Sequence, residues 1–126
     1  MTSKELLRDR TKMLGLRIIR LVDTLPKSGS AKIIGNQLLR AGLSIGANYR
    51  AACRGRSTVD MIAKLKIVEE EADECAFWME TLCDSGIVAS GKMTAIMGET
   101  NEILAMTVAS IKTLRSKRRQ TVSDRR

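Results

Sequence analysis

Apolar residues recur every three or four positions along most of this 126-residue chain, which is the spacing of one face of an α-helix. Pro26 and Gly29 interrupt the pattern first, followed by Gly55 and then by Gly86 and Gly91. Proline cannot continue a helix, and glycine ends one readily because it tolerates positive φ, as we expect of Gly55. The spacing therefore predicts four helices, spanning Ser3–Thr24, Ser30–Arg54, Thr58–Asp84 and Lys92–Ser116.

Polar residues at the predicted helix starts support these boundaries. Thr2 and Glu5 have the spacing of a capping box. Ser30 is placed to cap the second helix, and Ser57, with Asp60 three residues later, is placed to cap the third.

Each predicted helix carries one apolar seam. The seam residues are Leu7, Leu14, Ile18, Leu21, Val22 and Leu25; Ile34, Leu38, Ala41, Ile45 and Ala52; Met61, Leu65, Val68, Ala72, Cys75, Met79 and Leu82; and Met93, Met97, Thr100, Leu104, Thr107, Ile111 and Leu114. Short connections make neighbouring helices antiparallel. The pattern predicts an all-α, antiparallel, up-down-up-down four-helix bundle over residues 1–116. Residues 117–126, where the periodicity stops, are expected to form a basic disordered tail.

Four apolar residues fall away from the seams: Phe77, Trp78, Leu16 and Leu39. Apolar residues on the outside of a bundle mark a second interface, so these four predict contacts between subunits of a ring-like homo-oligomer. The alternative is that the apolar stripes are wide and the helices rotated.

Asn48 lies near the edge of the second seam, beside Tyr49. We interpret Asn48, with Ser44 and Ser57, as a structural polar residue. Its amide would be satisfied by backbone or by a neighbouring helix and would fix the register of the bundle, whereas a direct ligand contact is the alternative. The Tyr49 hydroxyl is expected to reach water.

The segment around Asn48 matches a pattern, Q-L-x-R-A-x-x-S-I-x-A-N, followed by a basic glycine-containing turn, a Ser cap and a Glu-rich helix. The matching residues are Gln37, Leu38, Arg40, Ala41, Ser44, Ile45, Ala47, Asn48, Gly55, Arg56, Ser57 and the stretch Ile67–Ala76. In these residues the chain resembles the ribosomal RNA intervening-sequence proteins, a four-helix-bundle family related in fold to the Avd accessory proteins of diversity-generating retroelements. The resemblance covers about Leu14 to Leu114. It implies a bundle that often forms a ring of five subunits, with no known catalytic residues.

Positive charge is concentrated at the C-terminus. The net charge is +8, and the last twelve residues hold six basic residues and one acidic residue, a net of +5. Such a cluster attracts polyanions, although it also serves simply to keep a disordered end soluble. Arg40, Arg50 and Arg54 project from the back of the second helix over about 21 Å, because a helix rises 1.5 Å per residue. We predict that nucleic acid contacts this ridge together with Arg56, Lys117, Arg118 and Arg119.

A rival interpretation assigns the arginine ridge to subunit contacts. The outer face of the third helix is acidic, carrying Glu69, Glu70, Glu71, Asp73, Glu74 and Glu80. This face of one subunit would meet the ridge of the next in a heterologous contact. Charge reversal at Arg50 and Arg54 would then break the oligomer, whereas at a nucleic-acid surface it would lower only the affinity for nucleic acid.

The composition argues against several kinds of chemistry. The chain has no histidine, which removes imidazole catalysis and the Glu-x-x-His ligands of di-iron bundles, and three cysteines alone make a poor zinc site. We therefore expect no catalytic residues, no metal, no cofactor and no enzymatic activity.

The cysteines and the hydropathy bear on the compartment. Cys53, Cys75 and Cys83 are odd in number and lack a CxxC pattern, which favours a reducing compartment. No signal peptide and no apolar run of about 20 residues is present, so a cytoplasmic protein without membrane contact is expected.

Binding remains as the predicted role. The leading hypothesis is an oligomeric nucleic-acid-binding or adaptor protein, a pentamer by resemblance, that contacts phosphates independently of sequence. The alternatives are an Avd-like accessory subunit of a retroelement reverse transcriptase and a purely structural protein–protein scaffold.

Overall fold

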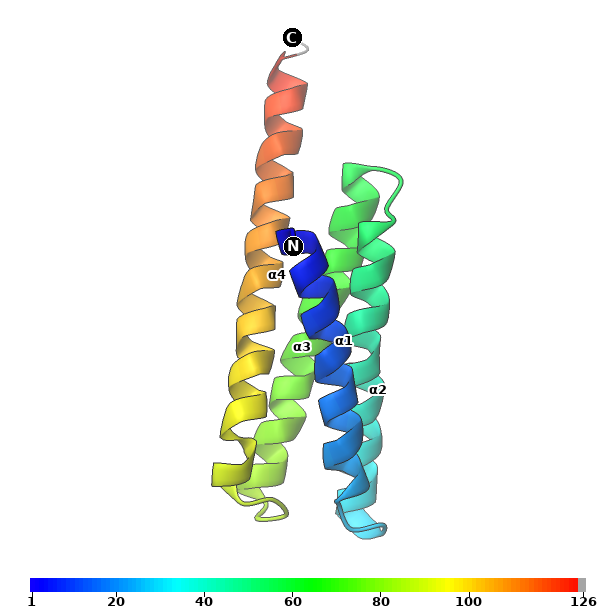
Figure 1. Cartoon of the computed structure of the whole chain (residues 1–126), viewed down its shortest axis with the longest axis vertical. Coiled ribbons are helices and arrows are strands. Elements are labelled where there is room, and N and C mark those ends of the chain that lie inside the picture. The colour runs from blue at the N-terminus through cyan, green and yellow to red at the C-terminus, as the bar shows by residue number, and fades with distance from the viewer. Residues whose placement is uncertain (125–126) are drawn as a thin grey trace.

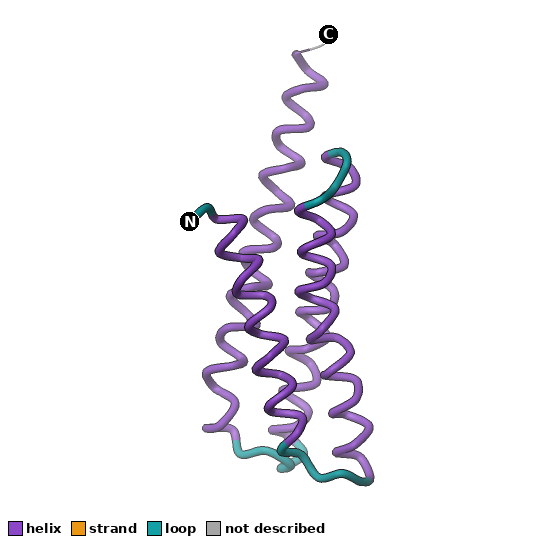
Figure 2. The backbone as a smooth tube through the Cα atoms, turned by 45° about the vertical axis from the view of Figure 1, so that its right-hand side comes forward, coloured by secondary structure: helices purple, strands orange, loops and turns teal. Residues whose placement is uncertain are grey.

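Four α-helices account for nearly all of the chain. The computed structural model describes residues 1–124, which form α1 (Ser3–Asp23), α2 (Gly29–Cys53), α3 (Thr58–Asp84) and α4 (Ser90–Asp124). Figure 1 shows the helices lying side by side, and Figure 2 shows that helices and short loops alone build the described part of the chain. The α1–α2 and α3–α4 turns lie at one end of the bundle, and the α2–α3 turn lies at the other (Figure 1). The prediction of an all-α four-helix bundle is confirmed.

The predicted seams line one continuous core. The largest fully buried side chains come from all four helices and include Leu14, Ile18, Leu38, Ile45, Met79, Leu82, Met93 and Ile103. In α4 Ile96 and Ile103 are buried, whereas the predicted Met97 and Leu104 are half-buried beside them. The helix is thus rotated slightly about its axis relative to the prediction. The sequence does not determine this rotation, because the apolar stripe of α4 is two residues wide.

Glycines let α1 and α2 approach closely. A Cβ added at Gly42 would lie 2.5 Å from Cδ1 and 3.0 Å from Cγ2 of Ile18, and one added at Gly46 would lie 3.4 Å from the Thr11 carbonyl oxygen. These glycines lie in the interior of a helix, where glycine costs stability, so their role is to make room for the neighbouring helix. This contact is not evident from the spacing of apolar residues in the sequence.

The predicted caps are confirmed at two helices and wrong at one. Thr2 and Glu5 form the capping box, with both hydrogen bonds at 3.1 Å, and Ser57 Oγ accepts the Asp60 backbone N–H at 3.1 Å. Ser30 is not a cap, because α2 already begins at Gly29. Gly29 adopts a φ of 63°, which turns the chain into the helix before residue 30 is reached.

The two predicted glycine stops differ in mechanism. Gly86 has a φ of 78°, and the Val88 N–H donates to the Leu82 carbonyl at 3.1 Å, which closes the end of α3 as predicted. The expected positive φ of Gly55 is wrong. Gly55 is needed for space, because a Cβ there would overlap the Met61 side chain and lie 3.1 Å from the Ala52 carbonyl oxygen.

The fourth helix is longer than predicted. It starts at Ser90 and reaches Asp124, so the predicted disordered tail is wrong for residues 117–124, while residues 125–126 lie outside the described part. Extending an existing helix is favourable because each added residue gains one backbone hydrogen bond without a new nucleation cost. This segment also has no proline or glycine and contains several residues with high helix propensity. The C-terminal part of α4 therefore projects beyond the other three helices (Figure 1). None of the four helices, over residues 1–124, is long and apolar enough to cross a membrane.

Candidate nucleic-acid interface

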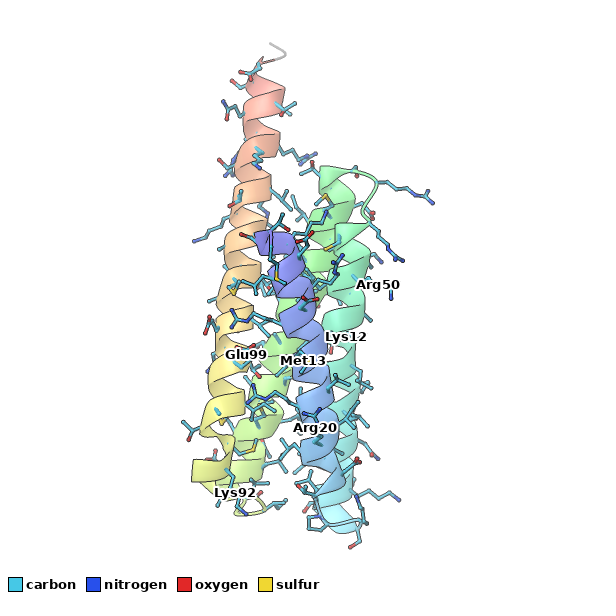
Figure 3. The ribbon with its side chains drawn as sticks, in the orientation of Figure 1. Lys12, Met13, Arg20, Arg50, Lys92 and Glu99 are labelled. Atoms are coloured by element: carbon cyan, nitrogen blue, oxygen red, sulfur yellow. The ribbon has the colours of Figure 1, made fainter. Side chains whose placement is uncertain are left out.

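Basic side chains gather at the end of the bundle that carries the α2–α3 turn. Arg50 lies on the last turn of α2, Arg54 is the C-cap residue of this helix, and Arg56 lies in the α2–α3 turn. The projecting part of α4 leaves from the same end (Figure 1) and adds three exposed cations. We call these six residues the basic end: Arg50, Arg54, Arg56, Lys117, Arg118 and Arg119. Figure 3 shows Arg50 on the outer side of the bundle, in the half nearer this end.

The cations of the basic end are not neutralised within the chain. All six residues are exposed, and no acidic side chain among residues 1–124 lies within salt-bridge distance of any of them. Arg56 contacts Asp60 only through its backbone, whose N–H donates to Asp60 Oδ2 at 3.2 Å. Their charges are therefore available to an anion from outside.

Arg40 does not belong to this surface, which corrects the predicted ridge. Its guanidinium reaches across to α3, where Nη2 lies 2.5 Å from Glu74 Oε1 and Nη1 lies 3.3 Å from Glu71 Oε2. This pairing with Arg40, reinforced by the Trp78 indole N–H, lowers the pKa of Glu74. The sequence placed Arg40 correctly on the outer part of α2, but only the packing of α2 against α3 supplies its partners.

The same ion pairs bear on the rival interpretation of the acidic face. Glu71 and Glu74 are occupied by Arg40 of their own chain, and Glu69 lies 3.3 Å from Lys66 Nζ. Three of the six predicted acidic residues are thus already paired, so a contact of this face with another subunit stays a prediction that depends on the remaining three: Glu70, Asp73 and Glu80.

The four predicted interface residues divide into two pairs. Phe77 is 57% exposed and Leu16 is 37% exposed, as expected for residues off the seams. Trp78 and Leu39 are half-buried and pack against the core, as in the alternative of wide apolar stripes, so their contact with another subunit stays a prediction. Trp78 also donates from Nε1 to Glu74 Oε1 at 3.2 Å, which holds its ring beside Phe77.

The two polar residues at the α2 seam are satisfied locally. Asn48 Nδ2 donates to the Ser44 carbonyl oxygen at 2.9 Å and to Ser44 Oγ at 2.8 Å. Satisfaction by backbone, one of the two predicted arrangements, is therefore confirmed, and within residues 1–124 the amide makes no hydrogen bond to another helix. The prediction that the Tyr49 hydroxyl reaches water is wrong, because Tyr49 is 6% exposed and its hydroxyl donates to the Lys4 carbonyl at 3.4 Å. Burial raises the pKa of Tyr49 to about 12.

Sequence reasoning missed a charged cluster between α1 and α4. Arg10 donates from Nε and Nη2 to the two carboxylate oxygens of Glu99, at 3.1 and 2.5 Å, and Nη2 lies 3.0 Å from Glu102 Oε1. The Arg10 guanidinium lowers the pKa of Glu99. No spacing rule links residues so far apart in sequence, and the pairing becomes visible only once α1 and α4 are placed side by side.

The described residues offer little reactive chemistry. No group of three or more metal-ligating side chains is formed within residues 1–124. Cys75 is fully buried, and burial raises the pKa of its thiol to about 12, so it stays protonated near neutral pH.

Comparisons with known proteins agree with the fold. The chain is similar to a crystal structure from Bacteroides thetaiotaomicron, described as a protein of unknown function from the S23 ribosomal protein family, with a TM-score of 0.80 and 29% identity. The similarity covers 88% of this chain and 99% of that one. No curated protein matches.

Residues 7–109 match a family described as 23S rRNA-intervening sequence protein, which confirms the resemblance seen in the sequence. The matched range ends before the projecting part of α4, so Lys117, Arg118 and Arg119 lie outside it. Since the match spans most of the four-helix bundle, the chain belongs to the 23S rRNA-intervening sequence protein family.

Proposed function

We propose that this chain, as an antiparallel up-down-up-down bundle, is a non-enzymatic protein that binds the phosphates of nucleic acid through its basic end. The observation that carries the proposal is the gathering of six exposed cations from α2, the α2–α3 turn and α4 without an acidic partner among the described residues. Exposed, unpaired cations neutralise phosphates and release counterions. The family description names 23S rRNA, which makes structured RNA the first ligand to test.

The surroundings of the basic end favour phosphate contacts over base recognition. The chain has one tyrosine, one phenylalanine and one tryptophan. Tyr49 is buried, and Phe77 and Trp78 lie on α3 away from the α2–α3 turn, so no aromatic platform for base stacking accompanies the cations. Binding should therefore be tolerant of sequence and strongly dependent on salt.

A fluorescence-polarisation titration of a structured RNA and of duplex DNA, at several salt concentrations, tests this proposal. The test variant carries Arg54→Gln, Arg56→Gln and Arg118→Gln. The control carries Lys27→Gln, Lys32→Gln and Lys92→Gln, which remove the same charge from exposed positions near the opposite end. For duplex DNA, each lost phosphate contact should reduce the slope of log affinity against log salt by about 0.9.

We expect the test variant to lose about tenfold or more in affinity at low salt, with a reduced slope, whereas the control retains most of its affinity. An equal loss in both variants would mean that net charge alone drives binding. Absence of binding by the unaltered chain, even at low salt, would remove the proposal.

We also propose that the chain assembles with copies of itself. Phe77 and Leu16 remain substantially exposed on the outside of the bundle, and Leu43, which is 47% exposed, lies with Leu16 beside a shallow groove between α1 and α2. Exposed apolar residues of this size favour burial between subunits. A ring of subunits would multiply the number of basic ends offered to one nucleic acid, which raises avidity.

A further inference from the structure

The bundle is open at the basic end. A cavity of about 610 Å³ lies among residues of all four helices, which we call the end groove. Its floor consists of core residues Leu7, Tyr49, Ala52 and Leu65, each at most 6% exposed. Its walls include the half-buried side chains Cys53, Met61, Met106 and Leu114. The groove is therefore an accessible extension of the apolar core.

Few polar groups in the groove are available to a ligand. Ser110 Oγ donates to the Met106 carbonyl at 3.0 Å, and Thr113 Oγ1 donates to the Ala109 carbonyl at 3.1 Å. The Tyr49 hydroxyl donates to the Lys4 carbonyl. These hydroxyl hydrogens are already engaged, so the walls suit hydrocarbon better than a nucleobase, whose polar edge would be left without partners.

The only charged residues lining the groove are two lysines, Lys4 from α1 and Lys117 from α4. Both are exposed, and no carboxylate among residues 1–124 lies within salt-bridge distance of either ammonium group. An apolar cavity with ammonium groups at its edge complements a molecule that has a hydrocarbon chain and one anionic head.

We propose that the end groove binds a single-chain anionic amphiphile of the fatty-acid class. The alkyl chain lies against Met61 and Met106, and the carboxylate lies between Lys4 and Lys117. The volume falls in the range of small-molecule sites. Methionine walls adapt to flexible chains because the thioether side chain is unbranched and polarisable.

Two cysteines provide a test within one molecule. Cys53 lines the groove, and Cys83, which is also half-buried, lies near the far end of α3. The probe is decanoate below its micelle concentration, and the readout is the rate of alkylation of each thiol by N-ethylmaleimide, followed by mass spectrometry. We expect decanoate to slow alkylation of Cys53 by at least about threefold and to leave Cys83 unchanged.

Two matched variants test the position of the alkyl chain. Ala109→Trp places an indole over the groove, and Ala105→Trp places one on the same helix outside the lining; both positions are exposed, so neither change disturbs the core. Ala109→Trp should abolish the protection of Cys53 by decanoate, and Ala105→Trp should retain it.

A charge variant tests the position of the head group. Lys4→Gln with Lys117→Gln should weaken decanoate binding by at least about threefold, because an exposed ion pair changes affinity by up to about fivefold. The same variant should leave binding of the neutral 1-decanol unchanged. Lys112→Gln, an exposed lysine of α4 outside the lining, is the control.

Several outcomes would overturn this proposal. One is equal protection of Cys53 and Cys83, and another is no protection at any decanoate concentration below micelle formation. Protection by phosphatidylglycerol vesicles but not by decanoate would assign the groove to a membrane surface. Protection of Cys53 that depends on protein concentration alone would assign it to a second copy of the chain. None of these results would bear on the proposal that Arg54 and Arg56 bind nucleic acid, which the titrations of RNA and DNA test separately.

Discussion

Gly42 determines how closely α1 approaches α2. Its α-carbon faces Ile18, which is fully buried, and an added Cβ would lie 2.5 Å from Ile18 Cδ1. Gly98 offers a natural comparison, because it lies inside α4 with no atom of another helix within 4 Å of an added Cβ. The two positions separate the effect of packing from the intrinsic preference of a helix for alanine over glycine.

We expect Gly42→Ala to lower the free energy of unfolding by about 1 kcal/mol, since overpacking outweighs the gain in helix propensity. Gly98→Ala should raise it by about 0.5–1 kcal/mol, through propensity alone. Urea denaturation monitored by circular dichroism measures both. A stabilising Gly42→Ala would show that α1 and α2 are not in close contact.

The Arg10–Glu99 pair predicts a specific dependence of stability on pH. Both side chains are 22% exposed, and the arginine lowers the pKa of Glu99 below its ordinary value of 4.5. A carboxyl whose pKa is lower in the folded state stabilises that state above the unfolded pKa, and the contribution is lost as pH falls through the folded pKa. The pair should therefore stabilise the bundle at neutral pH and cease to do so in acid.

At pH 7 we expect Glu99→Gln to lower the free energy of unfolding by about 1 kcal/mol, with the difference from the unaltered chain shrinking as pH falls below about 4.5. Urea titrations between pH 7 and pH 3 measure this. Glu102→Gln is the control, since Glu102 is 61% exposed and its change should cost less. A difference that does not vary with pH would contradict the ion-pair interpretation.

At the scale of elements, α4 shows that a helix does not need an apolar face along its whole length. Residues 117–124 are all exposed, yet they continue the helix that Met93, Ile103 and Ile111 anchor to the core. The periodicity of apolar residues indicates which part of a helix packs against the core, and it ends where the helix leaves the core. The sequence therefore located the end of the core correctly and the end of the helix incorrectly.

Removing residues 117–126 should reduce the helical circular-dichroism signal per molecule, because at least residues 117–124 are helical. The free energy of unfolding should change by less than about 0.5 kcal/mol, because the described part of this segment is exposed to solvent throughout. Far-UV spectra and thermal melts of the two chains measure both quantities. An unchanged helical signal would mean that the segment is not helical in solution.

At the scale of the whole molecule, the exposed apolar residues predict self-association. We expect the unaltered chain to form a homo-oligomer and Phe77→Ser to shift it toward the monomer, because Phe77 is the exposed aromatic residue of α3. Val59→Ser, at a 53% exposed position of the same helix, is the control and should leave the assembly intact. Size-exclusion chromatography with light scattering measures the mass. A monomer at all concentrations of the unaltered chain would contradict the proposal.

The sequence by itself determined the class of fold, the approximate bounds of the four helices, most core positions and the family. It could do so because helical periodicity, turn residues and caps are local properties that short segments carry. Leu14, Ile45 and Met79 were placed in the core by spacing alone, and the Ser57 cap was predicted from Ser57 and Asp60.

Only the tertiary structure decided which charges are free and where the core is open. Arg40 and Arg54 look alike on the outer side of one helix, yet α3 neutralises the first and leaves the second to solvent. Likewise, the sequence places Met61 in a seam and does not single out Met106, yet the arrangement of the four helices makes both of them walls of the end groove. Charge pairing and cavity shape depend on groups distant in sequence, and no local pattern records those distances.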